Sequence, residues 1–385
     1  MTEQLRIYIS YIRRRAAMSD VPEGYKMSEV GVIPEDWDVK KIENIAPLQR
    51  GFDLPNNELE NGEYPVVYSN GIVNYHCTYK VKAPGVVTGR SGTIGKVTFV
   101  EADYWPHNTS LWVTDFKGND PKYIYYLYLK INLERFGTGS GVPTLNRNDV
   151  HSFKIFFPPT IEEQQAIASA LSDMDALIAA LGQLITKKRN IKQGAMQQLL
   201  TGEKRLPGFG GEWDVKKIGE IANIRKGQLI TENTRIEGNI PVIAGGKKPA
   251  YYHNKPNRLN NTITISGSGA SAGYISYFEM PIFASDCSTL EEGEGYSIKF
   301  IFYQLQLRQD DIYKMQTGGA QPHIHPSDIY PLEFSCPQAE EQQAIAQILS
   351  DMDTEIETLK QKQAKYKAIK QGMMQELLTG KTRLV

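Results

Sequence analysis

The sequence lacks most features of a secreted, membrane-bound or zinc-binding protein. Its three cysteines, Cys77, Cys287 and Cys336, show no CxxC spacing, so neither a disulfide framework nor a zinc site is indicated. An unbroken run of about 18 apolar residues, which a membrane-spanning helix needs, is missing. Residues 1–17 lack the apolar centre and the cleavage site of a signal peptide. These absences predict a soluble protein of the reducing cytoplasm.

A basic excess is also lacking. The chain has 43 lysines and arginines against 44 aspartates and glutamates, a net charge of -1. Because DNA-binding domains usually show a basic excess, any contact with nucleic acid has to come from local basic groups. One such group is Arg13, Arg14 and Arg15, which belongs either to a poorly specified arm or to an arm that contacts phosphate.

Catalytic and nucleotide-binding motifs are absent as well. The glycine-rich stretch TGRSGTIGKV (88–97) fits neither G-x-x-x-x-G-K-[ST] nor G-x-G-x-x-G. FFPPT (156–160) lacks the leading Asp or Asn of the amino-methyltransferase motif, and no helicase, G-x-S-x-G or H-E-x-x-H motif occurs. The chain is therefore predicted to be non-catalytic. A cytoplasmic enzyme with an unrecognised pocket stays open as an alternative.

What the sequence does contain is a long internal repeat. EEQQAIASALSDMD returns as EEQQAIAQILSDMD, and an ungapped alignment of residues 162–202 with 340–380 gives 26 identities in 41 positions. Upstream of each copy, EDWDVKKIENIA (35–46) matches GEWDVKKIGEIA (211–222). The repeating unit is therefore a whole domain followed by a helix, and self-similarity of this size decides the fold prediction.

Between the repeated blocks the two copies keep a framework while their side chains change. The aligned stretches are TGRSGTIGKV with SGSGASAGYI (266–275), PHNTSL (106–111) with ASDCST (284–289), and TGSGVPTLNRNDV (138–150) with TGGAQPHIHPSDI (317–329). The predicted division is an N-terminal arm (1–21), a first variable domain (22–158), a central helical spacer (159–204), a second variable domain (205–336) and a C-terminal helical spacer (337–385).

The apolar residues of both spacers are spaced alternately by four and three, which is typical of a coiled-coil seam. The predicted seam comprises Ile167, Leu171, Met174, Ile178, Leu181 and Ile185 in the first spacer and Ile345, Leu349, Met352, Ile356 and Leu359 in the second, which resumes at Tyr366, Ile369, Met373 and Leu377. Each helix needs a helical partner, and the other copy is the nearest, so we expect an antiparallel pair. A plain coiled-coil interaction protein would show the same pattern.

Each variable domain alternates short β-like runs with one helical stretch, such as residues 121–137 or 296–315. This predicts a mixed α/β (α+β) fold: two globular α/β domains separated by two long helices that form an antiparallel coiled coil with a pseudo-twofold internal repeat. The polar side chains between the turn glycines can contact phosphates or base edges, although ordinary solvated loops look similar. His323 and His325 could suggest a metal, but their counterparts Thr144 and Asn146 are poor ligands, so no metal site is predicted.

The doubled order of these blocks resembles the DNA-specificity subunits of type I restriction-modification systems, from about residue 22 to the end. The residues that carry the resemblance are GYKMSEVGVIPEDWDVKKI (24–42), the glycine-rich turn, PPTIEEQQAIASALSDMD and QGAMQQLLTGEKRLPGFGGEWDVKKIGEIA, the last three repeated wholly or in part.

The resemblance implies a non-catalytic subunit whose two target-recognition domains each read one half of a bipartite, asymmetric site in double-stranded DNA. It also implies that two modification subunits, which carry S-adenosylmethionine, dock on the helices and domains. Restriction subunits that use ATP and Mg²⁺ would join them, so no cofactor is expected in this chain. Without these partners, we expect the exposed helical faces to favour a homodimer.

Matching the loops to this family gives the candidate DNA contacts. For phosphates they are Arg50, Lys96, Arg147, Lys226 and Lys248. For bases they are Ser69, Asn70, Arg90, Thr144, Asn146, Lys247, Ser268, Gln321, His323 and His325, with Ser91, Thr93 and Ser271 as further donors on the glycine-rich turns. Neither the half-site sequences nor the spacer length can be read from the sequence.

Overall fold

The structure, a computed structural model, describes residues 21–139 and 141–384, and only the main chain of Glu292. The predicted N-terminal arm, with Arg13, Arg14 and Arg15, lies outside the described residues except for Val21. The chain divides into two compact units. The first unit comprises the described residues up to Ala180 and those from Gln363 onward, and the second unit comprises Leu181–Lys362. Each unit contains one variable domain, the start of the long helix that follows it, and the end of the other long helix.

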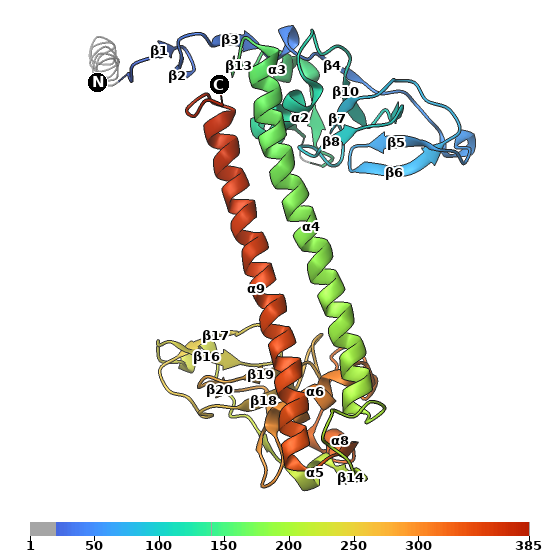
Figure 1. The fold of residues 1–385 in the computed structure, drawn as a ribbon, viewed down its shortest axis with the longest axis vertical. Helices are drawn as coiled ribbons and strands as arrows, with labels where there is room; N and C mark the ends of the chain where they lie inside the picture. Colours follow the sequence, from blue (N-terminus) through green and yellow to red (C-terminus); the bar gives the residue numbers. More distant parts are fainter. Residues whose placement is uncertain (1–20, 140, 385) are drawn as a thin grey trace. The chain divides into compact units, whose positions relative to one another are not determined.

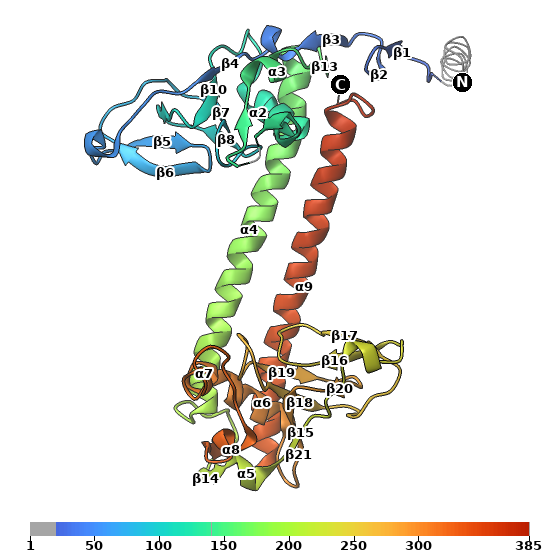
Figure 2. The same ribbon diagram turned by 180° about the vertical axis from the view of Figure 1, so that it is seen from behind.

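The first unit is built on an antiparallel four-stranded sheet in the order β4-β10-β7-β8, with a three-stranded sheet β6-β5-β9 beside it. Within this unit, Figures 1 and 2 show the hairpin β5–β6 on the side away from α4. The strands of the two sheets are β4 (Leu48–Arg50), β5 (Tyr64–Tyr68), β6 (Gly71–His76), β7 (Gly85–Gly89), β8 (Val97–Val100), β9 (Trp105–Pro106) and β10 (Ser110–Val113).

Short elements join these sheets to the helices. They are β1 (Tyr25–Ser28), β2 (Gly31–Pro34), β3 (Asp38–Lys41), η1 (Ile42–Asn44), η2 (Asn56–Glu58), α2 (Pro121–Ile131), η3 (Leu133–Phe136), β11 (Gly137–Thr138), β12 (Thr144–Leu145), α3 (Arg147–His151) and β13 (Lys154–Phe157). Asp120 caps α2 by accepting from the Tyr123 amide at 2.7 Å, and Pro121 is its first residue. Ile124 and Leu127 of α2 share a buried cluster with Val86 and Leu111 of the four-stranded sheet, so α2 covers one face of that sheet.

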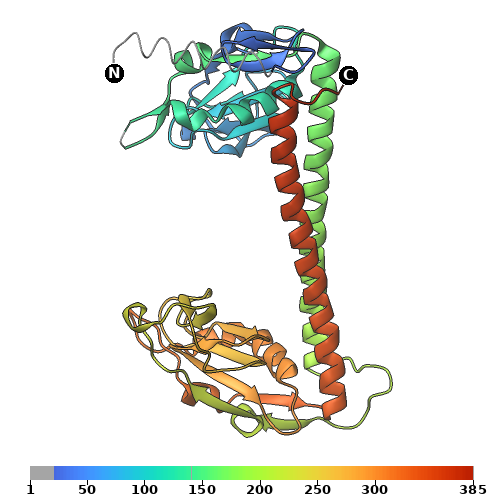
Figure 3. The same ribbon diagram turned by 90° about the vertical axis from the view of Figure 1, so that its left-hand side faces the viewer.

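The second unit repeats this plan with the sheets β15-β21-β18-β19 and β17-β16-β20. The three-stranded sheet lies farther from α9 than the four-stranded sheet does (Figures 1 and 3). The elements of this unit are β14 (Asp214–Lys217), α5 (Ile218–Ile221), β15 (Ala222–Lys226), η4 (Glu232–Thr234), β16 (Ile240–Ile243), β17 (Tyr251–His253), β18 (Thr262–Ser266), β19 (Ile275–Phe278), β20 (Phe283–Ala284), β21 (Cys287–Glu292), α6 (Ile298–Leu307), α7 (Gln309–Lys314), α8 (Pro326–Ile329) and β22 (Glu333–Cys336).

The two long helices are α4 (Ile161–Leu200) and α9 (Ala339–Leu377). In the first unit, Ile167 near the start of α4 shares a buried cluster with Leu377 at the end of α9. In the second unit, Ile345 near the start of α9 shares one with Leu199 at the end of α4. Within each unit the helices therefore pack antiparallel. The predicted mixed α/β fold with an internal repeat and antiparallel helices is confirmed.

By length and composition α4 could cross a membrane, because one 18-residue window reaches a mean hydropathy of 1.3. The buried side chains at its two ends, however, belong to the cores of the two units, and Asp173 and Asp175 lie in its first half. We conclude that α4 is a core helix of a soluble fold.

Burial along the predicted seam is deepest where a helix meets a variable domain. The buried seam residues are Ile167, Leu171, Leu181, Ile185, Ile345, Leu349, Ile356 and Leu377, and the half-buried ones are Met174, Ile178, Met352, Leu359, Tyr366 and Met373. The placement of Ile369 in the seam is wrong, since this side chain is 39% exposed. Its seam neighbours Tyr366 and Met373 are half-buried, so the exposure is confined to the turn of α9 that contains Ile369.

A buried carboxylate ties the start of α4 to the end of the chain. Glu163, 1% exposed, accepts from the Trp37 indole at 3.1 Å and from Arg383, whose Nη2 lies 2.9 Å away. Arg383 also makes a paired contact with Asp36 at 2.8 and 2.9 Å. These hydrogen bonds lower the pKa of the Asp36 carboxyl.

The second unit contains the same cluster with residues from the other parts of the repeat. Glu341, 2% exposed, accepts from the Trp213 indole at 3.3 Å and from Arg205 at 2.6 and 2.7 Å. Arg205 follows α4 in sequence, whereas Arg383 follows α9. In each unit, the arginine that binds the buried glutamate therefore comes from the segment after the long helix of the other repeat.

Each unit contains a second ionic cluster, whose aspartate follows the buried glutamate on the same long helix. In the first unit, Asp175 accepts from the Tyr126 hydroxyl at 2.8 Å and from Lys370 at 2.6 and 2.7 Å. The counterparts in the second unit are Tyr303, Asp353 and Lys192, at 2.9, 2.7 and 2.7 Å. Both clusters join a variable domain to two helices at once.

Candidate nucleic-acid interface

The glycine-rich turn of the first domain lies against the segment that precedes α3. Ser91 and Thr144 form an isolated β-bridge, and the Leu145 amide donates to the Arg90 carbonyl at 2.7 Å. In addition, the Gly92 amide donates to the Pro143 carbonyl at 3.0 Å. The structure thus brings together candidates that lie more than 50 positions apart in the sequence.

The second domain makes the same contacts with different residues. Ser268 and His323 form the bridge, the Ile324 amide donates to Gly267 at 3.0 Å, and the Gly269 amide donates to Pro322 at 3.0 Å. The pairing of Thr144 with His323, taken from the sequence alignment, is therefore also the structural one. The loop framework is the same in both domains, and the exposed side chains differ.

The turn that joins β5 to β6 completes this cluster of loops in the first domain. An added Cβ on Gly89 would lie 1.8 Å from the Thr93 carbonyl oxygen and 2.8 Å from that of Ser69, so only glycine allows the glycine-rich turn and the β5–β6 turn to approach this closely. Lys96 donates to the Asn70 carbonyl oxygen. The Lys96 ammonium is therefore held by the main chain and does not extend freely.

Arginine candidates of the first domain meet at a shared polar group. Arg50 pairs with Asp53 at 3.1 Å, and Asp53 also accepts from the Asn108 side chain. The half-buried Arg90 donates to the Asn108 carbonyl at 3.3 Å. Asp53 and Asn108 were not among the sequence candidates. Asn108 lies in the stretch PHNTSL, which aligns with ASDCST of the second domain and was predicted to belong to the framework rather than to the site.

His107, which precedes Asn108 in sequence, is a partly buried histidine. The centre of its ring lies 4.3 Å from the centre of the Tyr68 ring, and its Nδ1 lies 3.0 Å from the Thr109 hydroxyl. Burial lowers the pKa of His107, although a backbone hydrogen bond and Asp53 oppose the shift. The lowered pKa favours the neutral ring at pH 7.

Several candidates also have structural roles. Asn146 caps α3, because its side-chain oxygen accepts from the Asn148 amide at 3.0 Å, which leaves its amide NH₂ for other partners. Arg147, the first residue of that helix, is exposed. His325 is the N-cap residue of α8, and its main-chain amide donates to the Asp328 carboxylate at 2.8 Å.

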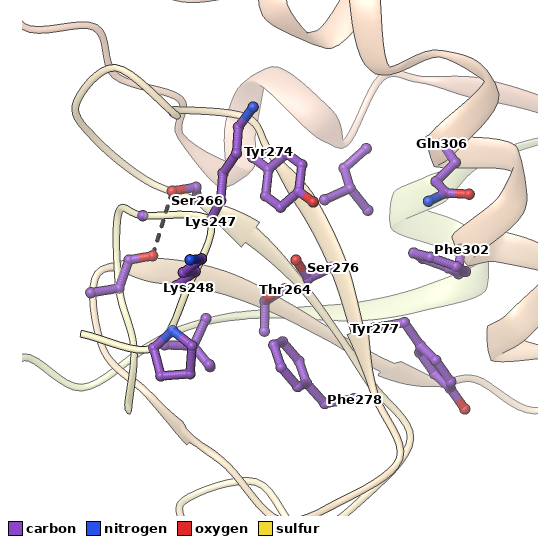
Figure 4. Close-up of a pocket in the computed structure, with 15 residues that line it drawn as sticks. Lys247, Lys248, Thr264, Ser266, Tyr274, Ser276, Tyr277, Phe278, Phe302 and Gln306 are labelled. Atoms are coloured by element: carbon purple, nitrogen blue, oxygen red, sulfur yellow. Dashed lines mark hydrogen bonds between the residues drawn. The ribbon is translucent and has the colours of Figure 1, made fainter. Parts of the chain in front are cut away.

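The cations of the second domain lie on two loops. Lys226 ends β15, and Lys247 and Lys248 lie in the turn that joins β16 to β17; all three are exposed. The Lys247 ammonium lies 5.0 Å from the centre of the Tyr274 ring, a cation–π distance. Figure 4 shows this lysine and the tyrosine side by side at the mouth of a cavity.

The remaining candidates of this domain surround the glycine-rich turn. Ser268 donates to Asp286, Ser271 is half-buried, and Gln321 is exposed. The rings of His323 and His325 are parallel, with centroids 6.3 Å apart. Within residues 21–139 and 141–384, no group of three or more His, Cys, Asp or Glu side chains could hold a metal ion.

The aligned glycine-rich stretches need a correction of one residue. Along β7 and β8 Thr88 faces Val97, and along β18 and β19 Ile265 faces Ile275. Thr88 therefore corresponds to Ile265 and not to Ser266, as the ungapped alignment had it. The turn of the second domain is one residue longer, and the identical glycines concealed this insertion.

Comparison with known proteins agrees with this architecture. The family model of the type I restriction modification DNA specificity domain matches residues 34–189 and 210–368. The MjaVIII type I restriction enzyme specificity subunit of Methanocaldococcus jannaschii is 26% identical over 404 residues, which cover 91% of this chain and 94% of the relative.

Two solved structures share the fold. The S subunit of a type I restriction-modification system from M. genitalium matches with a TM-score of 0.68 at 20% identity, over 91% of this chain and 97% of that chain. A chain from a study of complex assembly and conformational transition of the type I system matches with a TM-score of 0.53 at 15% identity, over 91% and 99% of the two chains.

Both variable domains match the family model separately, and together the matches include most of the chain. In this family the specificity subunit is non-catalytic, and the catalytic cofactors reside on the modification and restriction subunits. The repeated loop clusters and the antiparallel helices fit that role. The chain belongs to the family of specificity subunits of type I restriction-modification systems.

Proposed function

We propose that each variable domain is a target-recognition domain that reads one half of a bipartite, asymmetric site in double-stranded DNA. The domains are residues 22–158 and 205–336, separated by helical spacers at 159–204 and 337–385. The observation that carries the proposal is the loop cluster that occurs twice on one framework with different exposed side chains. Two copies of one fold with different loops are what an asymmetric site requires.

The exposed cations supply the phosphate contacts in this proposal. Arg50 and Lys226 lie at equivalent ends of β4 and β15, each facing the central strand of its sheet, and Arg147 and Lys248 are exposed on neighbouring loops. Because the chain has a net charge of -1, much of the remaining phosphate contact comes from partner subunits.

Base reading falls to the side chains that differ between the two clusters. In the first domain these are Arg90 and the free amide of Asn146, and in the second the imidazoles of His323 and His325. An Arg fork suits guanine and an Asn amide suits adenine. The Asn108 contact of Arg90 would have to be exchanged for a base contact on binding.

The helices give the partner subunits two equivalent docking faces and set the distance between the half-sites. Ile191 of the second unit is 46% exposed, and Ile369, its counterpart 178 positions later in the first unit, is 39% exposed. An apolar side chain exposed at equivalent positions of both repeats is what two identical partners would cover. Half-sites read from one face of DNA lie about one helical turn apart, roughly 34 Å.

In the complete assembly, two modification subunits with S-adenosylmethionine bind these faces, and restriction subunits with ATP and Mg²⁺ join them in the cytoplasm. Without partners, the exposed apolar side chains favour self-association of the chain. Sedimentation of the isolated chain at monomer mass, at concentrations used for assembly, would contradict that part of the proposal.

Methylation mapping tests the proposed function. The chain, co-produced with the modification subunit of its own system, should direct methylation of adenine only in a two-part sequence. Arg90→Ala should weaken or relax one half, and His323→Ala should do so for the other half alone. Equal methylation of substrates with either half scrambled would rule out the proposal and favour a simple coiled-coil scaffold.

A further inference from the structure

A cavity of about 310 Å³ opens in the second domain at the edge of its four-stranded sheet. Thr264 of β18 and Ser276 of β19 face each other across the ladder and form its floor. Lys247 and Lys248 lie at its mouth, and Phe278 forms part of its wall (Figure 4). The cavity lies directly beneath loops that hold candidate DNA contacts.

In the first domain, larger apolar side chains occupy the equivalent sheet face. The strand registers pair Val87 with both Thr98 and Trp112, and they pair Thr264 with both Ser276 and Thr289.

Val87 and Trp112 thus correspond to Thr264 and Thr289. In the first domain these two side chains pack in one apolar cluster. In the second domain Thr264 lines the cavity, and the Thr289 hydroxyl accepts from Arg258 at 2.8 Å. The valine-to-threonine replacement at position 264 therefore gives the floor of the cavity a hydroxyl group.

A second replacement changes the mouth of the cavity. Tyr274 stands where the first domain has Lys96, whose ammonium is bound to the Asn70 carbonyl across the turn. In the second domain the aromatic ring lines the cavity, and the Lys247 ammonium lies 5.0 Å from its centre. The opening therefore combines an aromatic face with mobile cationic side chains.

The lining has the chemistry that a nucleotide requires. The rings of Tyr274 and Phe278 offer flat surfaces against which a base can stack. The hydroxyls of Thr264, 2% exposed, and Ser276 can donate to or accept from a base edge. The two lysines at the mouth can neutralise a phosphate.

We infer that this cavity receives one nucleotide extruded from the half-site that the second domain reads. The inference rests on the proposed function. A base that stays in the duplex presents only its edge in a groove, so it cannot reach between two aromatic rings unless it leaves the stack. The first domain, whose equivalent face is filled, reads its half-site without extrusion.

Site-by-site substitution with 2-aminopurine tests the inference, since this base fluoresces more strongly when unstacked. The complex of this chain with its modification subunits is bound to duplexes carrying 2-aminopurine at one position at a time, in both halves of the mapped site. Besides the adenines that are methylated, one position should brighten severalfold in the half read by the second domain, and none in the other half.

Three variants connect that signal to the cavity. Ser276→Trp fills the cavity and should abolish the extra signal, whereas the matched Thr98→Trp in the first domain should leave it. Thr264→Val keeps the volume and copies Val87, so it should reduce the signal without a folding penalty. Tyr274→Ala should weaken binding of the complete site by roughly tenfold or more, through lost stacking.

The outcomes separate this inference from the proposed function. If bipartite methylation persists but only the methylated adenines brighten, the cavity does not receive a base from DNA and the inference is wrong. If methylation is not bipartite, the proposed function itself fails. Saturable binding of free 2-aminopurine deoxynucleoside monophosphate, lost in Ser276→Trp without any extra signal in DNA, would instead assign the cavity to a free nucleotide and overturn the inference.

Discussion

The two variable domains are alike where they meet the helices and different where their loops gather. Trp37, Glu163 and Arg383 repeat as Trp213, Glu341 and Arg205 with closely similar distances. On the outer sheet face, by contrast, a tryptophan and a valine of one domain are replaced by two threonines in the other. The contacts that each domain makes with the similar helices are therefore the same, whereas the sheet faces turned away from the helices have diverged.

This difference predicts which substitutions should lower the stability of the fold and which should change the binding of DNA. A helix-side cluster joins a domain to both helices through buried groups, so its loss weakens folding. A loop residue touches few buried groups, so its loss changes what the loop binds. The following variants are chosen to break the similarity at the helices or to test the difference at the loops.

Arg383→Ala should have the largest effect, a loss of about 3–5 kcal/mol in the free energy of unfolding of the first unit. The substitution leaves the carboxylate of Glu163, which is 1% exposed, with the Trp37 indole as its remaining partner. Denaturant unfolding, with hydrogen exchange of the amides at the start of α4, measures the change. Arg205→Ala should cause the same loss at the start of α9.

The pH dependence of this effect follows from Asp36. Its folded-state pKa lies below the ordinary value of 3.8 because it accepts hydrogen bonds from Arg383. The stabilisation is therefore present above that pH and is lost as the pH falls through the lower, folded-state value. Glu163→Gln in the Arg383→Ala background should recover part of the loss. A loss under about 1 kcal/mol at pH 7 would contradict a role of the buried carboxylate.

The Asp175–Lys370 pair should couple by about 1 kcal/mol in a double-mutant cycle of Asp175→Asn and Lys370→Met. The expected value is modest because the Asp175 side chain is 40% exposed and solvent screens the pair. In the second unit, Lys192 also lies 3.5 Å from Gln306, so the coupling with Asp353 should be smaller. Equal or larger coupling in the second unit would show that this additional acceptor has no effect.

The helices and the repeat could be predicted because they leave periodic patterns in the sequence. The seam of α4 is legible from Ile167 to Ile185, and the fold class follows from two such helices. The pairing of Arg383 with Glu163 could not be predicted, since 220 positions separate them and no local pattern marks an ion pair. The burial of Ile369 was predicted wrongly because spacing alone does not tell which face a domain covers.

In the candidate site, too, some features could be predicted from the sequence and others could not. The glycine-rich turns, Thr144 and His323 could be predicted as candidates from aligned motifs, but the bridges Ser91–Thr144 and Ser268–His323 could not. The cavity could not be predicted, because its floor depends on the pairing of Thr264 with Ser276 across a ladder, and the ungapped alignment was one residue out of register at Thr264. Asp53 was missed because its counterpart, three positions after Lys226, is Leu229, so the aligned loops share no acidic residue.

Phosphate contact by the equivalent cations should appear as a change in salt dependence. Lys226→Ala should reduce the slope of log affinity against log salt by about one, with a loss of affinity of a fewfold at physiological salt. Arg50→Ala should lose less, because Arg50 is already paired with Asp53 at 3.1 Å and has to leave it to reach DNA. Asp53→Asn is the matched control and should strengthen binding. An unchanged slope in both alanine variants would remove these residues from the interface.

Lys130→Leu should have the smallest effect and a distinctive pH profile. Burial, and then the positive charge of Lys381, lower the pKa of Lys130 from 10.5 to about 8. Its counterpart in α6, at the same distance from the helix cap, is Leu307.

Between about pH 8 and 10.5 the unfolded chain binds more protons at this site than the folded chain does, so the stability of the wild type rises across this window. Below pH 8 the lysine is charged in both states and the cost of burying it is fully present. The leucine variant should therefore melt higher than the wild type at pH 7, by on the order of 1–2 °C, and the difference should shrink towards pH 10.5.

Leu307→Lys in the second domain should introduce the reverse profile, with melting lowered at pH 7 and partly recovered at high pH. Thermal melting of the three chains at pH 7, 8.5 and 10 measures both effects. If the Lys130→Leu and wild-type profiles ran parallel over this range, the lysine would have to be solvated in the folded protein. The two domains would then differ at this position in composition but not in energy.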